Sequence, residues 1–184
     1  MATFLMPEGA EGPMDDPRTD AELVEAAKKG DLDAYGALVE RHREAVVAAA
    51  YHMVGDLHSA EDAAQEAFVE AFRKLRKLRE PGRFRTWLFS ILRRKCRRLK
   101  RKRREEPLAE PGCGAHNSPP EEALDVRLAL DSLPARYREV LVAKHVLGLS
   151  YAEIARALRT SEGNVRVLCF RATERLRQIV EGEG

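Results

Sequence analysis

Features of membrane-spanning, secreted and metal-binding proteins are scarce in this sequence. The longest uncharged apolar run, 45–51, has seven residues, whereas about 18 are needed to cross a bilayer. No basic start followed by an apolar stretch opens the chain, so the sequence predicts no secretory signal and a cytoplasmic protein. The three cysteines, Cys96, Cys113 and Cys169, form no CxxC pair, which argues against a disulfide framework or a structural zinc site.

Signatures of catalysis are missing as well. The sequence has no Gly-rich phosphate loop, no HExxH and no GxSxG motif, so nothing in it indicates an enzyme or a cofactor. Cys113 and His116 are the nearest approach to a metal-ligand pair, but two possible ligands do not make a site. Charged residues make up 34% of the chain and hydrophobic residues 44%. This composition indicates a soluble helical protein with small cores.

Charge is sorted along the chain, although the net charge is only +2. Residues 1–70 hold 5 Lys or Arg and 16 Asp or Glu, and residues 71–104 hold 17 and 1. A block with a net charge of +16 repels itself unless a polyanion or counterions lie against it, which favours nucleic acid as the partner. A solvated basic face and a docking surface for an acidic protein are the alternatives. We hypothesise that the acidic segment folds back on the basic block, so that deleting 1–18 strengthens nonspecific DNA binding at low salt.

Helical patterning dominates the sequence, which shows neither strand alternation nor an internal repeat. Capping signals and apolar periodicity predict four helices, over 19–30, 31–55, 59–79 and from about 84 to 104. The third of these is predicted to start at Ser59, with acidic residues in its first turn and cations in its last.

A linker is predicted over 105–121, where Pro, Gly and acidic residues replace the apolar periodicity. It divides the chain into a disordered acidic tail (1–18), a first helical domain (19–104) and a second helical domain (122–184). The predicted fold class is therefore all-α, with two small helical domains joined by a flexible linker.

The second domain carries a helix-turn-helix pattern. Ser150 and Glu153 form a capping box for its first helix, Ala155 is a small residue where two helices would cross, and Ser161 starts the second helix. Arg159 occupies the turn position where glycine is usual, which costs free energy if the backbone there is left-handed. A plain helical hairpin with a charged face is the alternative.

Five motifs follow one another along the chain: AEDxxQExF at 60–68, FxTWL at 84–88, LPxxYRExL at 133–141, GLSYxEIA at 148–155 and GxVR at 163–166. In their order and spacing they resemble bacterial RNA polymerase sigma factors of the extracytoplasmic-function (ECF) type. The resemblance covers most of the chain.

This resemblance implies a promoter-specificity subunit that binds core RNA polymerase, recognises −10 and −35 promoter elements and has no catalysis of its own. It implies that the first domain docks on the clamp helices of the β′ subunit, that the chain contacts the β flap, and that an anti-sigma protein is a further partner. Carboxylates on the third helix would meet basic residues across the polymerase interface. The implied polymerase-binding residues are Asp62, Gln65, Glu66 and Glu70.

The resemblance also implies two DNA-binding surfaces. The basic helix and the loop before it would open and bind the −10 element as single strand, because aromatic rings and cations hold exposed bases. Trp87 lies on the apolar face of that helix and is expected to support the loop from the core. The last helix would enter the major groove of the duplex −35 element, where Arg166 would bridge guanine acceptors. The implied −10 residues are Lys77, Arg79, Arg83, Phe84, Arg85, Trp87, Arg93, Arg94, Arg97 and Arg98, and the −35 residues are Ser161, Glu162, Asn164, Arg166, Val167, Phe170 and Arg171.

The chain departs from the family pattern at both DNA-binding surfaces. Arg94 and Arg98 stand where Asn and Asp are frequent, which makes single-strand binding more electrostatic. Val167 adds apolar surface to the last helix and would meet a thymine methyl group. Two other functions are open at this stage: a stand-alone regulator that uses only the helix-turn-helix, and an interaction protein that binds an inhibitor. The stand-alone regulator leaves the basic block unexplained.

Overall fold

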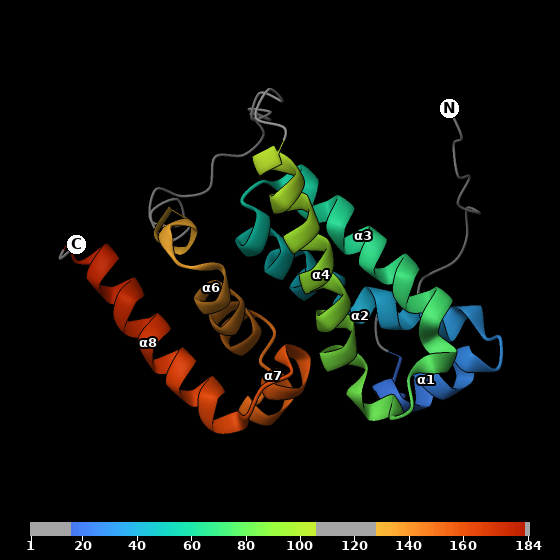
Figure 1. Cartoon of the computed structure of the whole chain (residues 1–184). Helices are drawn as coiled ribbons and strands as arrows, with labels where there is room; N and C mark the ends of the chain where they lie inside the picture. Colours follow the sequence, from blue (N-terminus) through green and yellow to red (C-terminus); the bar gives the residue numbers. More distant parts are fainter. Residues whose placement is uncertain (1–15, 106–127, 183–184) are drawn as a thin grey trace.

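The computed structural model describes residues 16–105 and 128–182, and all regular structure within them is helical. This confirms the all-α prediction. The predicted linker apart from residue 105, most of the predicted tail, and Cys113 with His116 lie outside the described residues. The described helices are α1 (Asp20–Lys28), α2 (Leu32–Val54), α3 (Leu57–Lys74), α4 (Phe84–Glu105), α6 (Ala135–Leu141), α7 (Tyr151–Leu158) and α8 (Glu162–Val180), with a further helical segment at 128–132 (Figure 1).

Local capping fixes where the first helices start. Thr19 and Glu22 form the predicted capping box at α1, because each side chain accepts from the other's backbone N–H. The prediction that α3 begins at Ser59 is wrong. The Asp56 carboxylate accepts from the Ser59 N–H at 2.8 Å, so Asp56 is the cap and the helix starts at Leu57.

The far end of α3 also differs from the prediction. The α-helix stops at Lys74 and continues as a 3-10 turn over Leu75–Lys77, so the predicted end at 79 is too late. Arg76 and Lys77 therefore lie in the turn between α3 and α4. A second 3-10 turn, Pro81–Arg83, leads directly into α4.

The first four helices pack around alanine-rich faces. α3 buries Ala60, Ala64, Ala67 and other alanines against α2, which lets the two helix axes approach closely. The Tyr35 hydroxyl on α2 donates to the Phe68 carbonyl at 2.6 Å, so its polar end is satisfied inside this core.

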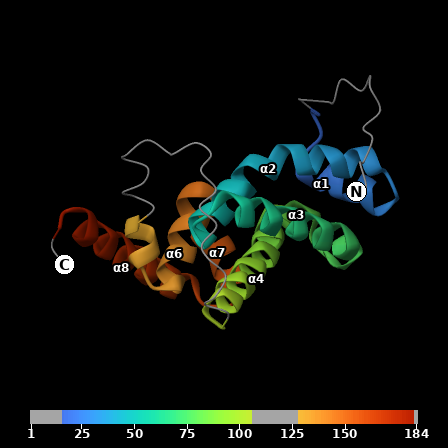
Figure 2. The ribbon, with the colours of Figure 1, turned by 90° about the horizontal axis from the view of Figure 1, so that it is seen from above.

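The two halves of the chain pack against each other. One continuous set of buried apolar side chains extends from α1 to α8, and α4 contacts α7 directly. Both views place the green α4 beside the orange α6 and α7 (Figures 1 and 2). Arg138 crosses the boundary, since its buried guanidinium donates to the carbonyls of Leu130 and Asp131 at 2.7 Å and of Met53 on α2 at 3.3 Å. The sequence left this packing undecided.

The helix-turn-helix forms as predicted. Ser150 and Glu153 cap α7, and Ser161 caps α8 by accepting from the Asn164 N–H at 3.2 Å. Arg159 adopts a left-handed backbone with φ 54°, the one positive φ outside glycine among the described residues. A π-helical turn, Val142–Val146, precedes the motif and was not predicted. No helix within the described parts of the chain is long and apolar enough to cross a membrane.

Candidate polymerase and nucleic-acid interfaces

The cations predicted to bind the −10 element line α4 and the loop before it. Lys77, Arg79, Arg85, Arg94, Arg97 and Arg98 are exposed, and Arg83 and Arg93 are partly exposed. Exposed guanidinium and ammonium groups of this kind suit phosphate contacts. This surface therefore has the charge that the sequence predicted, on one helix and its preceding turn.

The two aromatic residues of this surface lie inward. Phe84 is 0% exposed, and its ring centroid is 5.7 Å from that of His42 and 6.4 Å from that of Trp87. The prediction that Phe84 contacts DNA is wrong in this conformation, because the side chain belongs to the core between α2 and α4. Trp87 is partly buried against the same core, as its position on the apolar face predicted.

The predicted polymerase surface on α3 adjoins the basic surface of α4. Glu66 pairs with Lys95 at 3.0 Å, and Glu70 pairs with Lys95 at 3.1 Å and with Arg94 at 2.9 Å. A hydrogen bond from Lys74, helped by Lys95 and the charge of Arg94, lowers the pKa of the Glu70 carboxyl to about 2. Part of the acidic segment therefore does neutralise the basic block.

Asp62 and Gln65 complete the predicted polymerase surface. Both side chains are exposed on α3. Asp62 has the exposed His58 at 3.7 Å, one helical turn before it. On this surface of α3, Asp62 and Gln65 therefore lie beside Glu66 and Glu70, which form ion pairs with cations of α4.

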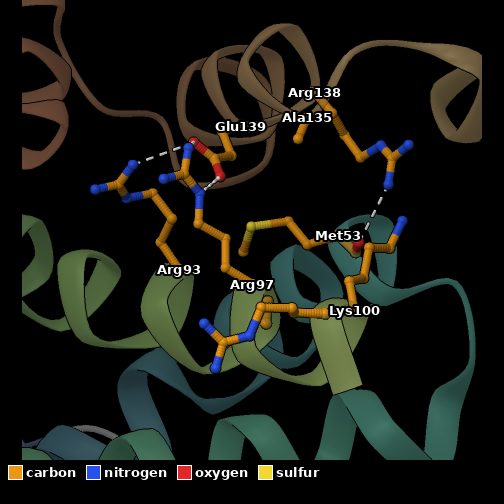
Figure 3. Close-up of a pocket in the computed structure, with 9 residues that line it drawn as sticks. Met53, Arg93, Arg97, Lys100, Ala135, Arg138 and Glu139 are labelled. Carbon is orange, nitrogen blue, oxygen red and sulfur yellow. Dashed lines mark hydrogen bonds and ion pairs between the residues drawn. The ribbon is translucent and has the colours of Figure 1, made fainter. Parts of the chain in front are cut away.

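The most buried contact of the basic surface is with the second half of the chain. Glu139 on α6 is 3% exposed. Its carboxylate accepts from Arg97 at 2.5 and 2.9 Å and from Arg93 at 3.3 Å (Figure 3). We call these three residues the Glu139 cluster. The Nε of Arg93 is buried without a hydrogen-bond partner, so this cluster is not fully satisfied.

Weaker contacts extend this boundary along α4. Lys100 pairs with Asp131 at 3.1 Å, and the Thr86 hydroxyl donates to Glu153 at 3.2 Å. Burial and the nearby Arg138 guanidinium lower the pKa of Lys100, despite the hydrogen bond to Asp131. A cavity of about 200 Å³ lies beside the Glu139 cluster, between α4 and α6 (Figure 3).

The predicted −35 residues share one face of α8. Ser161, Glu162, Asn164, Arg166, Val167, Phe170 and Arg171 are all exposed, whereas Val165, Cys169 and Ala172 are buried. Phe170 is 69% exposed and Val167, three residues before it on the same helix, is 46% exposed, so the two form an exposed apolar strip. Helix α8 thus presents polar groups at its start and apolar groups one turn later.

Comparison with known proteins finds matches to both halves of the chain. The family model for sigma-70 region 2 matches residues 38–106, and that for sigma-70 region 4 matches residues 123–176. The chain is 32% identical over 180 residues to the ECF sigma factor SigE of Mycolicibacterium smegmatis, covering 91% of this chain and 70% of that protein. It is 31% identical over 175 residues to SigW of Bacillus subtilis, covering 84% and 93%. The chain belongs to the sigma-70 family, in its ECF group. It is a promoter-recognition subunit that directs transcription initiation by RNA polymerase.

A solved structure matches this sigma factor across both halves. CnrH, in complex with the cytosolic domain of CnrY, has a TM-score of 0.74 and 31% sequence identity, covering 90% of this chain and 99% of CnrH. RpoE of Bartonella quintana, in complex with the anti-sigma factor NepR, shares the fold at a TM-score of 0.67 and 24% identity, covering 80% of this chain and 96% of RpoE.

Sequence reasoning missed three residues of this sigma factor that the surfaces depend on. Lys95 was passed over among the cations of α4, and Arg138 and Glu139 were noted only as motif letters. One signal was available for the last two, because the Arg-Glu pair directly precedes the apolar run 140–143 within a predicted helix. No three His, Cys, Asp or Glu side chains within the described parts are grouped so as to hold a metal ion.

Proposed function

We propose that this sigma factor uses three separate surfaces in transcription initiation. The exposed face of α3, with Asp62, Gln65, Glu66 and Glu70, binds the clamp helices of core RNA polymerase. The cations of α4 and its preceding turn bind the opened −10 element. The exposed face of α8 binds the duplex −35 element. The protein acts in the cytoplasm and supplies no catalysis, since the polymerase performs the chemistry.

One observation carries this assignment: the described surface divides into an acidic face, a basic face and a recognition helix, each on a different element. An interface between carboxylates on α3 and basic polymerase residues would be favourable through electrostatic complementarity. The α4 cations would supply affinity that falls with salt and carries little sequence information. The polar start of α8 would supply base contacts in the major groove.

The conformation described here limits how α4 binds DNA. Arg93 and Arg97 already donate to a buried carboxylate of α6, and the same guanidinium hydrogens cannot serve a phosphate at the same time. We therefore propose that α6 separates from α4 when the −10 element binds. A matching solved structure, CnrH, was determined in complex with the cytosolic domain of CnrY. An anti-sigma protein that binds the packed arrangement of α4 and α6 better than the separated one would hold this chain in it.

The test of the polymerase surface is co-elution with purified core polymerase. Asp62→Arg combined with Glu66→Arg should abolish co-elution, because two repulsive charges replace two attractive ones. Glu40→Arg combined with Glu44→Arg is the matched control, since both glutamates are exposed on α2 at the same four-residue spacing. Equal co-elution of both double variants would exclude α3 as the polymerase surface.

Transcription from a promoter library tests the function as a whole. Core polymerase with this sigma factor should give specific run-off transcripts that core polymerase alone does not give. Binding to a promoter sequence by the free chain, with no effect of polymerase, would instead indicate a stand-alone regulator.

A further inference from the structure

Tyr151 joins three elements at the start of the helix-turn-helix. It is the first residue of α7, and its ring lies under two cations from different elements. Lys144 Nζ, from the π-helical turn, is 4.7 Å from the ring centroid, and Arg166 Cζ, from α8, is 5.1 Å from it. Both distances are within the range of a cation–π contact.

Arg166 is held from a second direction by its own helix. Its Nη2 is 2.5 Å from the Glu162 carboxylate, one turn earlier on α8. A guanidinium that lies over a ring is attracted through its face and keeps N–H groups at its edge for hydrogen bonds. One carboxylate contact uses only part of that edge, because the group has five N–H donors. The restrained group therefore keeps donors for a base.

The pair of cations on Tyr151 would also attract an anion. In the described parts of the chain no carboxylate pairs with Lys144 as Glu162 does with Arg166. Two like charges beside one ring repel each other unless an anion lies near them. A DNA phosphate next to a contacted base would supply that charge.

The packing of Tyr151 does not by itself demand a tyrosine. The side chain is only partly buried and lies at the margin of the apolar core. A leucine would serve at such a margin, but it has no π face to attract a cation. The ring is thus the part of Tyr151 that the two cations require.

We infer that Tyr151 is a positioning residue for −35 recognition, whose ring holds the Arg166 guanidinium in place to bond one guanine and holds Lys144 beside the neighbouring phosphate. The inference rests on the proposed function, in which α8 meets the −35 element. Arg166 would donate to the guanine O6 and N7 acceptors. Tyr151 acts through Arg166 and touches no base.

The experiment uses holoenzyme and a promoter duplex that the holoenzyme has selected from a library. Each guanine of the −35 element is replaced in turn by 7-deazaguanine, which removes the N7 acceptor and keeps the base pair. With wild-type chain, one replacement should weaken binding by about 2- to 12-fold, because it removes one of the two hydrogen bonds of a bidentate contact. With Tyr151→Leu or Arg166→Ala, the same replacement should weaken binding less than about twofold.

Control variants separate positioning from folding and from charge. Tyr151→Phe keeps the ring and should keep the full penalty for 7-deazaguanine. Lys144→Gln should weaken binding to every sequence alike and lower the salt dependence by about one phosphate contact, with the penalty unchanged. Thermal unfolding of each variant reports any structural defect, which would not selectively remove sensitivity to one acceptor atom.

Three results would overturn the inference. A full penalty in Tyr151→Leu would show that the ring does not position Arg166, and a lost penalty in Tyr151→Phe would assign the effect to the hydroxyl. Absence of a penalty at every guanine with wild-type chain would exclude the Arg166–guanine contact. Failure of the holoenzyme to select any promoter is a different result, because it overturns the proposed function itself.

Discussion

Replacing Glu139 by glutamine should loosen the packing of α6 against α4. The substitution keeps the shape of the side chain and removes the charge that faces Arg93 and Arg97. Both guanidinium groups would then be left without a counter-charge at the boundary, whereas solvent would surround them once the halves separate. The packed arrangement therefore loses free energy and the separated one does not.

The magnitude follows from the burial of the three side chains. Glu139 is 4% exposed at its side chain and Arg93 16%, but Arg97 is 51% exposed. Removing one partner of a fully buried pair costs about 3–5 kcal/mol, and an exposed pair contributes about 0.2–1 kcal/mol. A cluster between these limits should lose about 1–3 kcal/mol. This shifts the equilibrium toward separation by about 5- to 150-fold.

Two measurements on the free chain check this expectation. Small-angle X-ray scattering should give a larger radius of gyration for Glu139→Gln, and fluorescence anisotropy should give tighter binding to single-stranded DNA. Glu174→Gln is the matched control, since it removes the same charge from an exposed site on α8 that pairs with Arg177. If both variants keep the wild-type radius and bind DNA equally, the Glu139 cluster does not restrain α4 and the reasoning is refuted.

Two further predictions concern stability. Arg159→Gly should raise the free energy of unfolding by about 0.5–1 kcal/mol and the thermal midpoint by about 2 °C. Glycine adopts the left-handed backbone at φ 54° without strain, and this gain exceeds the extra chain entropy that glycine loses on folding. An unchanged midpoint would contradict this. Burial lowers the pKa of His52 below 6.5, and its Nδ1 is buried without a hydrogen-bond partner. As the pH falls, the unfolded chain therefore binds a proton at His52 before the folded chain does. The stability that neutral His52 contributes is complete above pH 6.5 and is lost as the pH falls through the lower folded pKa. Urea unfolding from about pH 8 to 5 should show this decline in the wild type and a flatter profile in His52→Gln.

Local signals in the sequence predicted most of the helix boundaries. The capping boxes at Thr19 and Ser150 involve residues three apart, so a short window contains the whole interaction. The failure at α3 is also local, because Asp56 and Ser59 are both residue types that cap helices and lie three residues apart. Ser59 supplies the N–H that Asp56 accepts from, so only the earlier residue serves as the cap.

Long-range packing explains what the sequence did not predict at the candidate site. The hydrogen bonds of Glu139 join it to residues 42 and 46 positions earlier, and no local pattern records such a pairing. Phe84 was misassigned for the same reason, since its neighbour His42 comes from α2. The exposed face of α8 could be predicted because helical periodicity alone separates it from Val165 and Cys169.

The contacts between α3 and α4 link the proposed polymerase and DNA surfaces energetically. Glu66 and Glu70 hold Lys95 and Arg94 in the free chain. If polymerase residues bind those two carboxylates, the cations lose their partners and a DNA phosphate can replace them. Binding of either partner should then strengthen binding of the other, because coupling between two sites is reciprocal. The sorted charges of the sequence would in this way keep α4 occupied by the chain's own carboxylates until polymerase and promoter are both present.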